Sequence, residues 1–270
     1  MKNMYQPSKQ ILDRELPWNK LNVGLYFNKY FDEEDIREKG QGEKKDNNNK
    51  SKVNKAVSYF KKSNANLESV KTHVNRQKNL IKSKNGKIIN ITSNSRTVVG
   101  MGIPHPLKNG LLFHHTIGMP YIPGSSIKGM VRAWAEQNIN SDEEKEVFKR
   151  IFGSNPFIKS DNNEKTDGTN IGNIIFLDAL PLKLKYCEDI MTPHYSKYYG
   201  EKEFPADWDS PNIIKFLAIE DASFQLGIIP RSKNMEKEID LTYKWLKEAF
   251  EILGIGAKTA VGYGRYEVTD

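Results

Sequence analysis

Apolar and polar positions along residues 96–270 alternate in the way expected of an α+β domain. Short runs rich in β-branched and aromatic residues have the pattern of strands, and two longer stretches have the 3.6-residue period of helices. The predicted strands are residues 96–102, 173–180, 215–219, 223–229 and 262–268, with an extended segment at 111–115 and helices at 126–137 and 236–253. The order of strand, helix, strands, helix and strand is the βαββαβ order of the ferredoxin-like (RRM-like) fold.

Residues 1–95 have a different pattern and are predicted to form a mainly helical N-terminal extension. The stretch 1–37 is too apolar for a solvated tail, which predicts one or two short helices packed on the main domain. Residues 38–90 form a polar insertion whose first part has the composition of a mobile loop. Within it, apolar residues at near-helical spacing predict a helix in residues 52–79.

Positive charge is concentrated in this insertion. Residues 38–90 hold 14 of the 41 basic residues and 4 of the 34 acidic residues, so the local balance is +10 and that of the remaining chain is −3. A segment of this kind attracts phosphate polymers or anionic surfaces. A solvated Lys/Asn-rich insertion without a partner explains the composition equally well.

Other chemistry is mostly excluded by composition. No apolar run approaches the roughly 20 residues of a membrane-spanning helix, so no membrane segment is expected. The single cysteine, Cys187, excludes an internal disulfide and is compatible with a reducing cytoplasm. His114 and His115 are adjacent in an extended segment and point to opposite faces, so no metal site is predicted, and no cofactor is expected.

The first candidate binding segment is the start of the helix predicted at residues 126–137. Ser125 has the side chain of an N-cap, and Gly124 before it allows a sharp turn. Lys128 and Arg132 are four residues apart and share the face of the helix opposite the apolar residues, next to Ser125. Backbone N–H groups at a helix N-terminus, hydroxyls and cations suit a phosphate. A capped amphipathic helix with two solvated cations explains the same residues without a ligand.

The second candidate segment, residues 254–264, has four glycines around a central Lys-Thr pair, a composition that lets the backbone approach a polyanion closely. A Walker A loop and a dinucleotide fingerprint are excluded, because positions that must be glycine are Ala257 and Ile252 for the first and Thr259 for the second. A helix C-cap at Gly254 and a hairpin turn explain part of the pattern. The candidate contacts are Gly254, Gly256, Ala257, Lys258 and Thr259.

A third segment, residues 191–199, combines several aromatic residues with a cation and an imidazole. His194, Tyr195 and Lys197 are candidate contacts, because RNA bases stack on such side chains. Packing inside the protein explains most of the tyrosines as well.

Several of these segments resemble conserved parts of the RAMP superfamily. GIGAKTAVGYGRY from residue 254 is similar to its glycine-rich loop, and YIPGSSIKGMVR from residue 121 is similar to a helix start of the same group. Further segments, at 22–31, 99–105, 189–195 and 205–208, resemble within this superfamily the sixth RAMP subunit of type III-B CRISPR (Cmr) effector complexes. The similarity runs from about residue 20 to the end and is interrupted by the insertion at 38–90.

The resemblance implies a ferredoxin-like fold and an RNA-binding subunit of an antiviral effector. Its partners would be the 3′ part of the guide RNA, neighbouring RAMP subunits and, directly or indirectly, the target RNA. It also implies a subunit that is not an enzyme, because in this family a different backbone subunit cuts the target. The guide contacts implied by the resemblance are Ser125, Ser126, Lys128, Arg132, Gly256, Ala257, Lys258 and Thr259.

The sequence is compatible with two other functions. A RAMP-type, metal-independent endoribonuclease that processes guide precursors would use His194 with Tyr195, or His105, as general acid and base. For a structural scaffold that holds neighbouring subunits without touching RNA, charge reversals at Lys128, Arg132 and Lys258 would leave RNA affinity unchanged.

Overall fold

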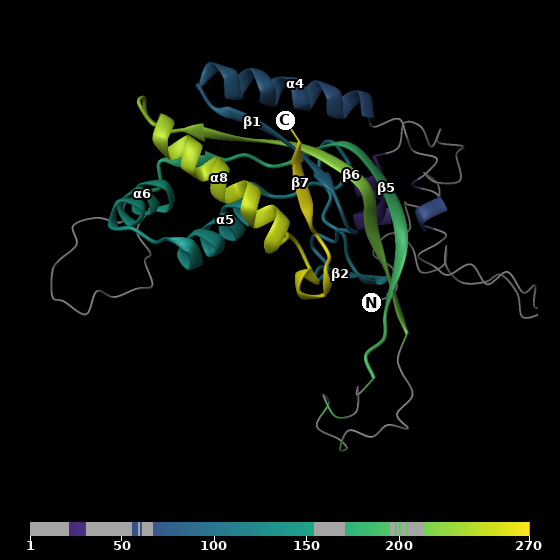
Figure 1. The fold of residues 1–270 in the computed structure, drawn as a ribbon. Helices are drawn as coiled ribbons and strands as arrows, with labels where there is room; N and C mark the ends of the chain where they lie inside the picture. Colours follow the sequence, from purple (N-terminus) through teal and green to yellow (C-terminus); the bar gives the residue numbers. More distant parts are fainter. Residues whose placement is uncertain are drawn as a thin grey trace, which may run out of the picture.

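The computed structural model is an α+β structure built on an antiparallel sheet (Figure 1). The sheet has the order β4-β6-β1-β7, and β5 also pairs with β6. The strands are β1 (Lys87–Ser93), β4 (Ile174–Phe176), β5 (Leu180–Met191), β6 (Ile214–Pro230) and β7 (Tyr266–Thr269). The described residues are 22–30, 56–58, 60, 67–153, 171–194, 198, 200, 204 and 213–269.

The long strand β6 organises the sheet. One edge of β6 pairs with β1, where Lys87 lies opposite Ile228 and Asn90 lies opposite Gln225. Its other edge pairs first with β4 and then with β5, which begins with Leu180 opposite Gln225. Farther along, β5 and β6 remain paired to their outer ends and form an arm that projects from the sheet (Figure 1).

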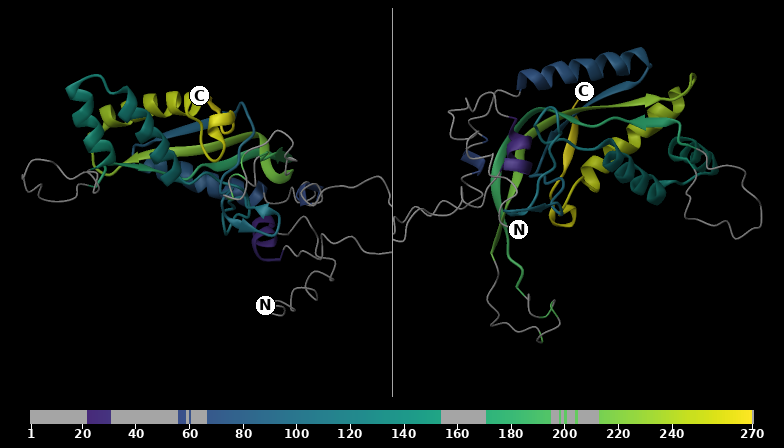
Figure 2. Two further views of the ribbon diagram at one scale, coloured as in Figure 1. Left: turned by 90° about the horizontal axis from the view of Figure 1, so that it is seen from below. Right: turned by 180° about the vertical axis from the view of Figure 1, so that it is seen from behind.

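Helices cover both faces of the sheet (Figure 2). Alternate residues of β6 point to opposite faces, and Gln225 donates a hydrogen bond to the carbonyl of Val74 in one helix. Its neighbour Phe224 contacts the ring of Tyr266, which contacts Phe250 of a helix on the other face. The first face carries α4 (Leu67–Ser83), and the second carries α5 (Gly124–Asn138), α6 (Asp142–Phe152) and α8 (Glu236–Ile252).

Short elements complete the described chain. Asn22 caps a short helix by accepting a hydrogen bond from the Leu25 N–H at 2.8 Å, and Val23 and Phe27 are buried in the core. Helical structure is therefore present at 22–30, in the part of residues 1–37 that the structure describes. Among the described helices, none has the length and apolar character needed to cross a membrane. The short elements are α2 (Val23–Leu25), η2 (Tyr26–Tyr30), β2 (Pro104–His105), β3 (Lys108–Asn109) and η4 (Thr259–Val261).

The first strand of the sheet lies earlier than the sequence analysis predicted. Strand β1 begins inside the predicted basic insertion, ends before the expected domain start at residue 96, and pairs with both β6 and β7. The strand predicted at 96–102 is wrong, because Thr97 forms only a single bridge to Ile219 and Gly100, with φ +80°, turns the chain. Helix α4 begins and ends later than the helix predicted at 52–79.

Other strand boundaries also differ. The single strand predicted at 173–180 is interrupted between β4 and β5, and the strands predicted at 215–219 and 223–229 are one strand, β6. Charged residues separate the two predicted runs, and one of them, Asp221, has a positive φ of +46° within the continuous strand. At 111–115 only an isolated bridge from Phe113 forms. The helices α5 and α8 lie within two residues of their predicted limits.

Candidate nucleic-acid interface

The glycine-rich segment at 254–264 folds as a compact loop held against the chain at 96–98. The N–H groups of Ala257 and Gly264 donate hydrogen bonds of 2.8 Å to the carbonyls of Val98 and Arg96. Gly256 has φ +97°, and a Cβ atom there would lie 2.5 Å from the Val98 carbonyl oxygen. A side chain at this position would therefore separate the two backbones, which explains why the sequence needs glycine here.

This loop leaves several backbone donors without a protein acceptor. Within the described chain, the N–H groups of Gly256, Lys258 and Thr259 donate to no other group. Lys258 has φ +64°, so the backbone turns sharply between them. Successive N–H groups in a sharp turn form a concave surface suited to an anion.

The start of helix α5 is capped differently from the sequence prediction. Pro123, not Ser125, occupies the N-cap position, and its side chain makes no capping hydrogen bond. The cap comes from the break between β4 and β5, where Asp178 Oδ1 accepts a hydrogen bond of 2.7 Å from the Gly124 N–H. A Cβ atom at Gly124 would clash with the Phe176 carbonyl, so glycine allows the helix to start directly against β4. Gly124 thus has a packing role.

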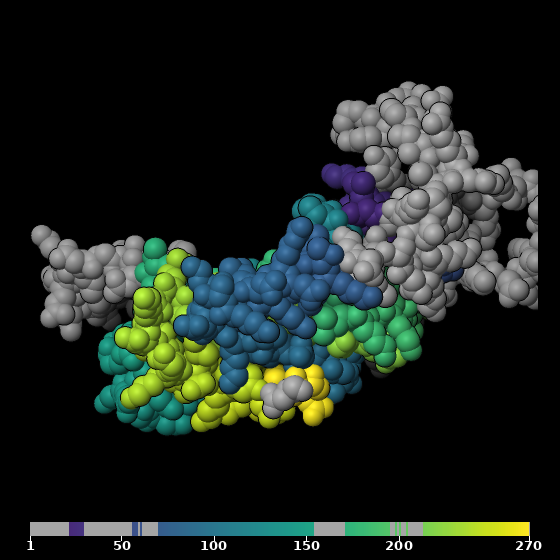
Figure 3. All heavy atoms as spheres, turned by 90° about the horizontal axis from the view of Figure 1, so that it is seen from above, coloured from purple at the N-terminus to yellow at the C-terminus, as the bar shows by residue number. Residues whose placement is uncertain are grey.

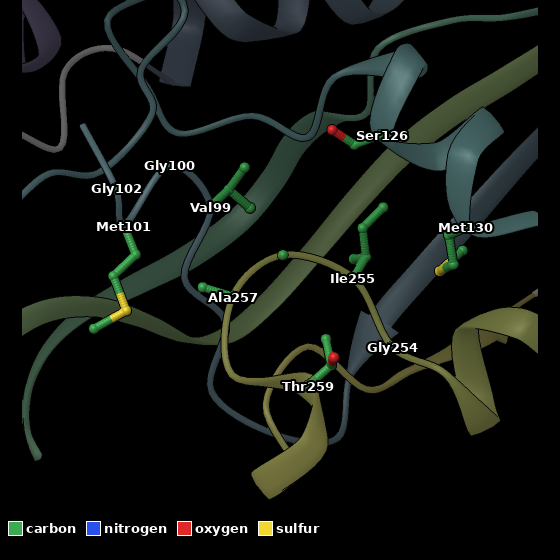
Figure 4. A pocket seen from close by; sticks show the side chains of 11 residues that line it. Val99, Gly100, Met101, Gly102, Ser126, Met130, Gly254, Ile255, Ala257 and Thr259 are labelled. Carbon is green, nitrogen blue, oxygen red and sulfur yellow. The ribbon is translucent and has the colours of Figure 1, made fainter. Parts of the chain in front are cut away.

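The two sequence-predicted segments meet around one open hollow of about 480 Å³. Figure 4 shows Ser126 of α5 and Thr259 of the loop on opposite sides of it. A third backbone segment with two glycines, residues 99–102, borders the hollow on another side; the sequence analysis assigned it to a strand and to the family resemblance, not to a binding site. The lining residues are 99–102, Ser126, Met130, residues 254–257 and Thr259.

Of the ten contact residues predicted in the first two segments, five line this hollow, namely Ser126, Gly254, Gly256, Ala257 and Thr259. The remaining five, which are Gly124, Ser125, Lys128, Arg132 and Lys258, do not line it, and Lys128 and Arg132 are about 120–160° around α5 from Ser126 and Met130. Ser125 is exposed in the same helical turn as Ser126.

The predicted cations of α5 are held in different ways. Arg132 forms an ion pair of 2.8 Å with Glu136 and lies over the ring of Phe148. Burial and the neighbouring guanidinium groups of Arg132 and Arg231 lower the pKa of Lys128. Lys128 therefore lies in a positive electrostatic environment, and a bound anion would offset the repulsion between these cations.

Lys258 leans on an aromatic surface next to the loop. Its Nζ lies 5.4 Å from the centre of the Phe216 ring and 5.7 Å from that of Tyr263, within cation–π range. Within the described chain, no carboxylate forms an ion pair with it. Its charge is thus placed at the edge of the loop without being neutralised.

A charged network anchors the loop to strand β5. The Tyr263 hydroxyl donates a hydrogen bond of 2.5 Å to Asp189, and Arg96 forms an ion pair of 2.8 Å with the same carboxylate. Burial and this hydrogen bond raise the pKa of Tyr263 to about 12. Burial of Asp189 opposes ionisation, but the hydrogen bonds from Tyr263 and Arg96 outweigh it and lower the pKa of its carboxyl group. This network fixes the loop and the arm relative to each other.

The histidines considered as acid–base groups lie elsewhere. His105 stacks on Phe27 with ring centres 3.8 Å apart, donates from Nε2 to the Phe27 carbonyl and accepts at Nδ1 from the Leu107 N–H. Both ring nitrogens are thus occupied, and burial lowers the pKa of His105. His194 is exposed beyond the end of β5, whereas Tyr195 and Lys197 lie outside the described residues. Among the described residues, no group of three or more metal-binding side chains comes together.

Comparison with known proteins gives the context for this loop. The chain is 28% identical to the CRISPR system Cmr subunit Cmr6 of Pyrococcus furiosus over 226 residues, which is 63% of this chain and 64% of that protein, less than two thirds of its length. It is also 28% identical to the CRISPR system CMR subunit Cmr6 of Saccharolobus solfataricus over 244 residues, 83% of this chain and 76% of that protein.

A solved structure shares the fold. A chain in the cryo-EM structure of the type III-B Cmr-beta bound to cognate target RNA has a TM-score of 0.64 and 21% identity, with 97% of this chain and 95% of that chain covered. The family description "RAMP superfamily" matches residues 90–267, which include most of the sheet, α5, α8 and the glycine-rich loop. The chain therefore belongs to the RAMP superfamily.

Proposed function

We propose that this protein is a non-catalytic RNA-binding subunit of a type III-B CRISPR (Cmr) effector complex in the cytoplasm. It would hold the backbone of the guide RNA, towards its 3′ part, and contact neighbouring RAMP subunits. Support comes from similarity to two Cmr6 proteins and from a fold shared with a type III-B structure. The order and antiparallel pairing β4-β6-β1-β7 suit a ferredoxin-like arrangement, with β1, α5, β4/β5, β6, α8 and β7 as its βαββαβ elements.

The hollow between α5 and the glycine-rich loop carries the proposal. Its lining combines backbone from two glycine-containing segments and the hydroxyl residues Ser126 and Thr259 with apolar side chains, which are those of Val99, Met101, Met130, Ile255 and Ala257. Backbone N–H groups and hydroxyls bind phosphate oxygens without reading bases, which is what a subunit must do to hold guides of different sequence. Lys258, in the loop at the edge of the hollow, supplies positive charge for the same phosphates.

The absence of catalysis is part of the proposal. Both ring nitrogens of His105 are used within the protein, so this residue is poorly placed to exchange protons with RNA. His194, the other histidine considered for a nuclease, is exposed and does not line the hollow.

Binding and cleavage are tested together with the protein, its neighbouring subunits and a synthetic guide. Lys258→Gln should weaken RNA uniformly across sequences and reduce the slope of log affinity against log salt by about 0.7, the contribution of one phosphate contact on a single strand. The matched control is Lys247→Gln, which removes the same charge from an exposed position on α8. Equal slopes for the two variants would remove Lys258 from the site.

A nuclease would give a different result. If the protein alone cleaves a guide precursor and His194→Ala abolishes the cleavage while RNA binding is retained, the non-catalytic proposal is wrong. We expect no cleavage by the protein alone and no effect of His194→Ala.

A further inference from the structure

Helix α4 carries a strong positive charge on the face of the sheet opposite α5 and α8. Residues 67–87 contain six basic residues and one acidic residue, Glu68. Of these cations, Lys87 forms an ion pair with Asp240. Within the described chain, Lys78 and Lys82 form no ion pair. The sequence analysis left two interpretations of this charge open, an attraction for phosphate polymers or anionic surfaces and a solvated stretch without a partner.

The cations are not spread evenly around the helix. The side that packs on the sheet contains Val70, Val74, Gln77 and Ile81, spaced three or four residues apart. At 100° per residue, a second set of residues at i, i+4, i+7 and i+11 shares one flank of the helix. This α4 flank consists of Lys71, Asn75, Lys78 and Lys82.

The α4 flank borders a cavity. A space of about 340 Å³ lies between α4 and the start of β5, with Lys71, Asn75 and Lys78 on one side and Pro181 and Leu182 on the other. This volume is within the range of small-ligand sites. Leu182 is 40% exposed, so an apolar surface faces the cavity next to the cations. Figure 3 shows the surface that α4 presents to solvent on this face.

The chemistry of this surface fits an unpaired nucleotide better than an acidic protein segment. An acidic peptide would neutralise Lys78 and Lys82 but would leave the apolar wall and the Asn75 amide without matching groups. A nucleotide carries phosphate for the lysines, a flat apolar face for Pro181 and Leu182, and polar base edges for an amide donor and acceptor.

We propose that the α4 flank and the start of β5 form a second RNA-binding surface, separate from the glycine-rich hollow, that takes a single-stranded segment with phosphates on Lys78 and Lys82 and a base in the cavity beside Leu182. The inference rests on the proposed association with RNA. It extends that function, because the surface lies on the other face of the sheet from α5 and offers a path for a second stretch of the bound RNA.

The test compares two charge reversals on the same helix. Lys78→Glu lies on the α4 flank, whereas Arg76→Glu makes the same change at an exposed position about 160° away around the helix. Affinity of the assembled complex for RNA is measured by fluorescence anisotropy at several salt concentrations. We expect Lys78→Glu to weaken binding on the order of fivefold or more and to lower the salt slope by about 0.7, with Arg76→Glu close to wild type. Equal losses would mean general attraction and would overturn the inference.

Crosslinking distinguishes this surface from the hollow. With RNA carrying 4-thiouridine, crosslinked peptides containing Lys78 or Leu182 support the proposal. Crosslinks at residues 254–264 without any on α4 or β5 would overturn it while leaving the proposed function intact, and crosslinks at neither place would overturn both. A zero-length crosslink from Lys78 or Lys82 to a carboxylate of another subunit, without RNA crosslinks on this face, would assign the surface to a protein partner and also overturn it.

Discussion

A negative charge placed in the hollow should weaken RNA binding, and the first turn of α5 offers a clean way to place it. Ser126 lines the hollow and Ser125, its neighbour in the same turn, does not. Both side chains are exposed, and the first turn of α5 contains no acidic residue. Aspartate in a first helical turn interacts favourably with the helix dipole, by about 0.3–1 kcal/mol, so neither substitution should damage the fold.

The size of the effect follows from the geometry of the hollow. Two unit charges 4 Å apart interact by about 1 kcal/mol in water and about 4 kcal/mol at an effective dielectric constant of 20. Because the hollow is open to solvent, we expect Ser126→Asp to cost about 1–2 kcal/mol of binding free energy, a loss of roughly five- to thirtyfold in affinity. Ser125→Asp, with its carboxylate on the adjacent side of the helix, should lose about threefold or less.

The assay is titration of fluorescent guide RNA with each variant at fixed ionic strength, alongside thermal unfolding to show that both variants are folded. Loss of affinity for Ser126→Asp well above that for Ser125→Asp supports phosphate in the hollow. Equal losses of affinity would mean that both serines contact phosphate, as the family resemblance alone implies. Unchanged affinity in both variants would refute the assignment of this hollow to RNA.

Three further predictions concern stability. Gly256→Ala and Gly262→Ala both place a side chain at positive φ, but only the Cβ at position 256 meets backbone within 3 Å. Chemical denaturation should therefore show a larger loss of unfolding free energy for Gly256→Ala than the roughly 1–3 kcal/mol of strain expected for Gly262→Ala. Equal losses would contradict the close approach of the two backbones at Gly256. Because the pKa of Asp189 is lowered in the fold, its contribution to stability is present above about pH 4 and is lost as the pH falls further. Asp189→Asn should cost about 1–3 kcal/mol of unfolding free energy at neutral pH and reduce the loss of stability in acid. Stability–pH curves that run parallel for the variant and the wild type would argue against the network. The lowered pKa of His105 means that stability falls as pH drops below about 6.5, and His105→Gln should remove that slope in pH-dependent thermal unfolding; an unchanged slope would exclude His105 as its source.

The sequence predicted the helices of this fold better than its strands. Helices α5 and α8 have strong apolar periodicity and near-complete agreement with their predicted limits. Strand β1 was missed although Ile89 and Ile91 alternate with polar residues, because it follows a Lys/Asn-rich stretch whose composition dominated the interpretation. In contrast, the β-branched residues at 97–99 are buried without belonging to a strand, since packing against the glycine-rich loop decides their conformation.

The candidate site was predicted in its parts and not in its assembly. The glycine-rich loop and the helix start were recognised as local patterns, but nothing local indicates that they meet around one hollow or that residues 99–102 complete it. Capping of Gly124 by Asp178 depends on a contact between residues 54 positions apart. The sequence therefore suggested Ser125 as the cap, because only nearby residues enter such a prediction.

The most direct test of RNA binding in the hollow is a crosslinking map of the assembled effector complex. A guide RNA with 4-thiouridine at successive positions is assembled with this protein and its neighbouring subunits, irradiated, digested and analysed by mass spectrometry. The account predicts crosslinked peptides from residues 99–102, from the start of α5 around Ser126 and from residues 254–259, all from neighbouring positions of the guide. Efficient crosslinks to other subunits with none in these three segments would contradict it.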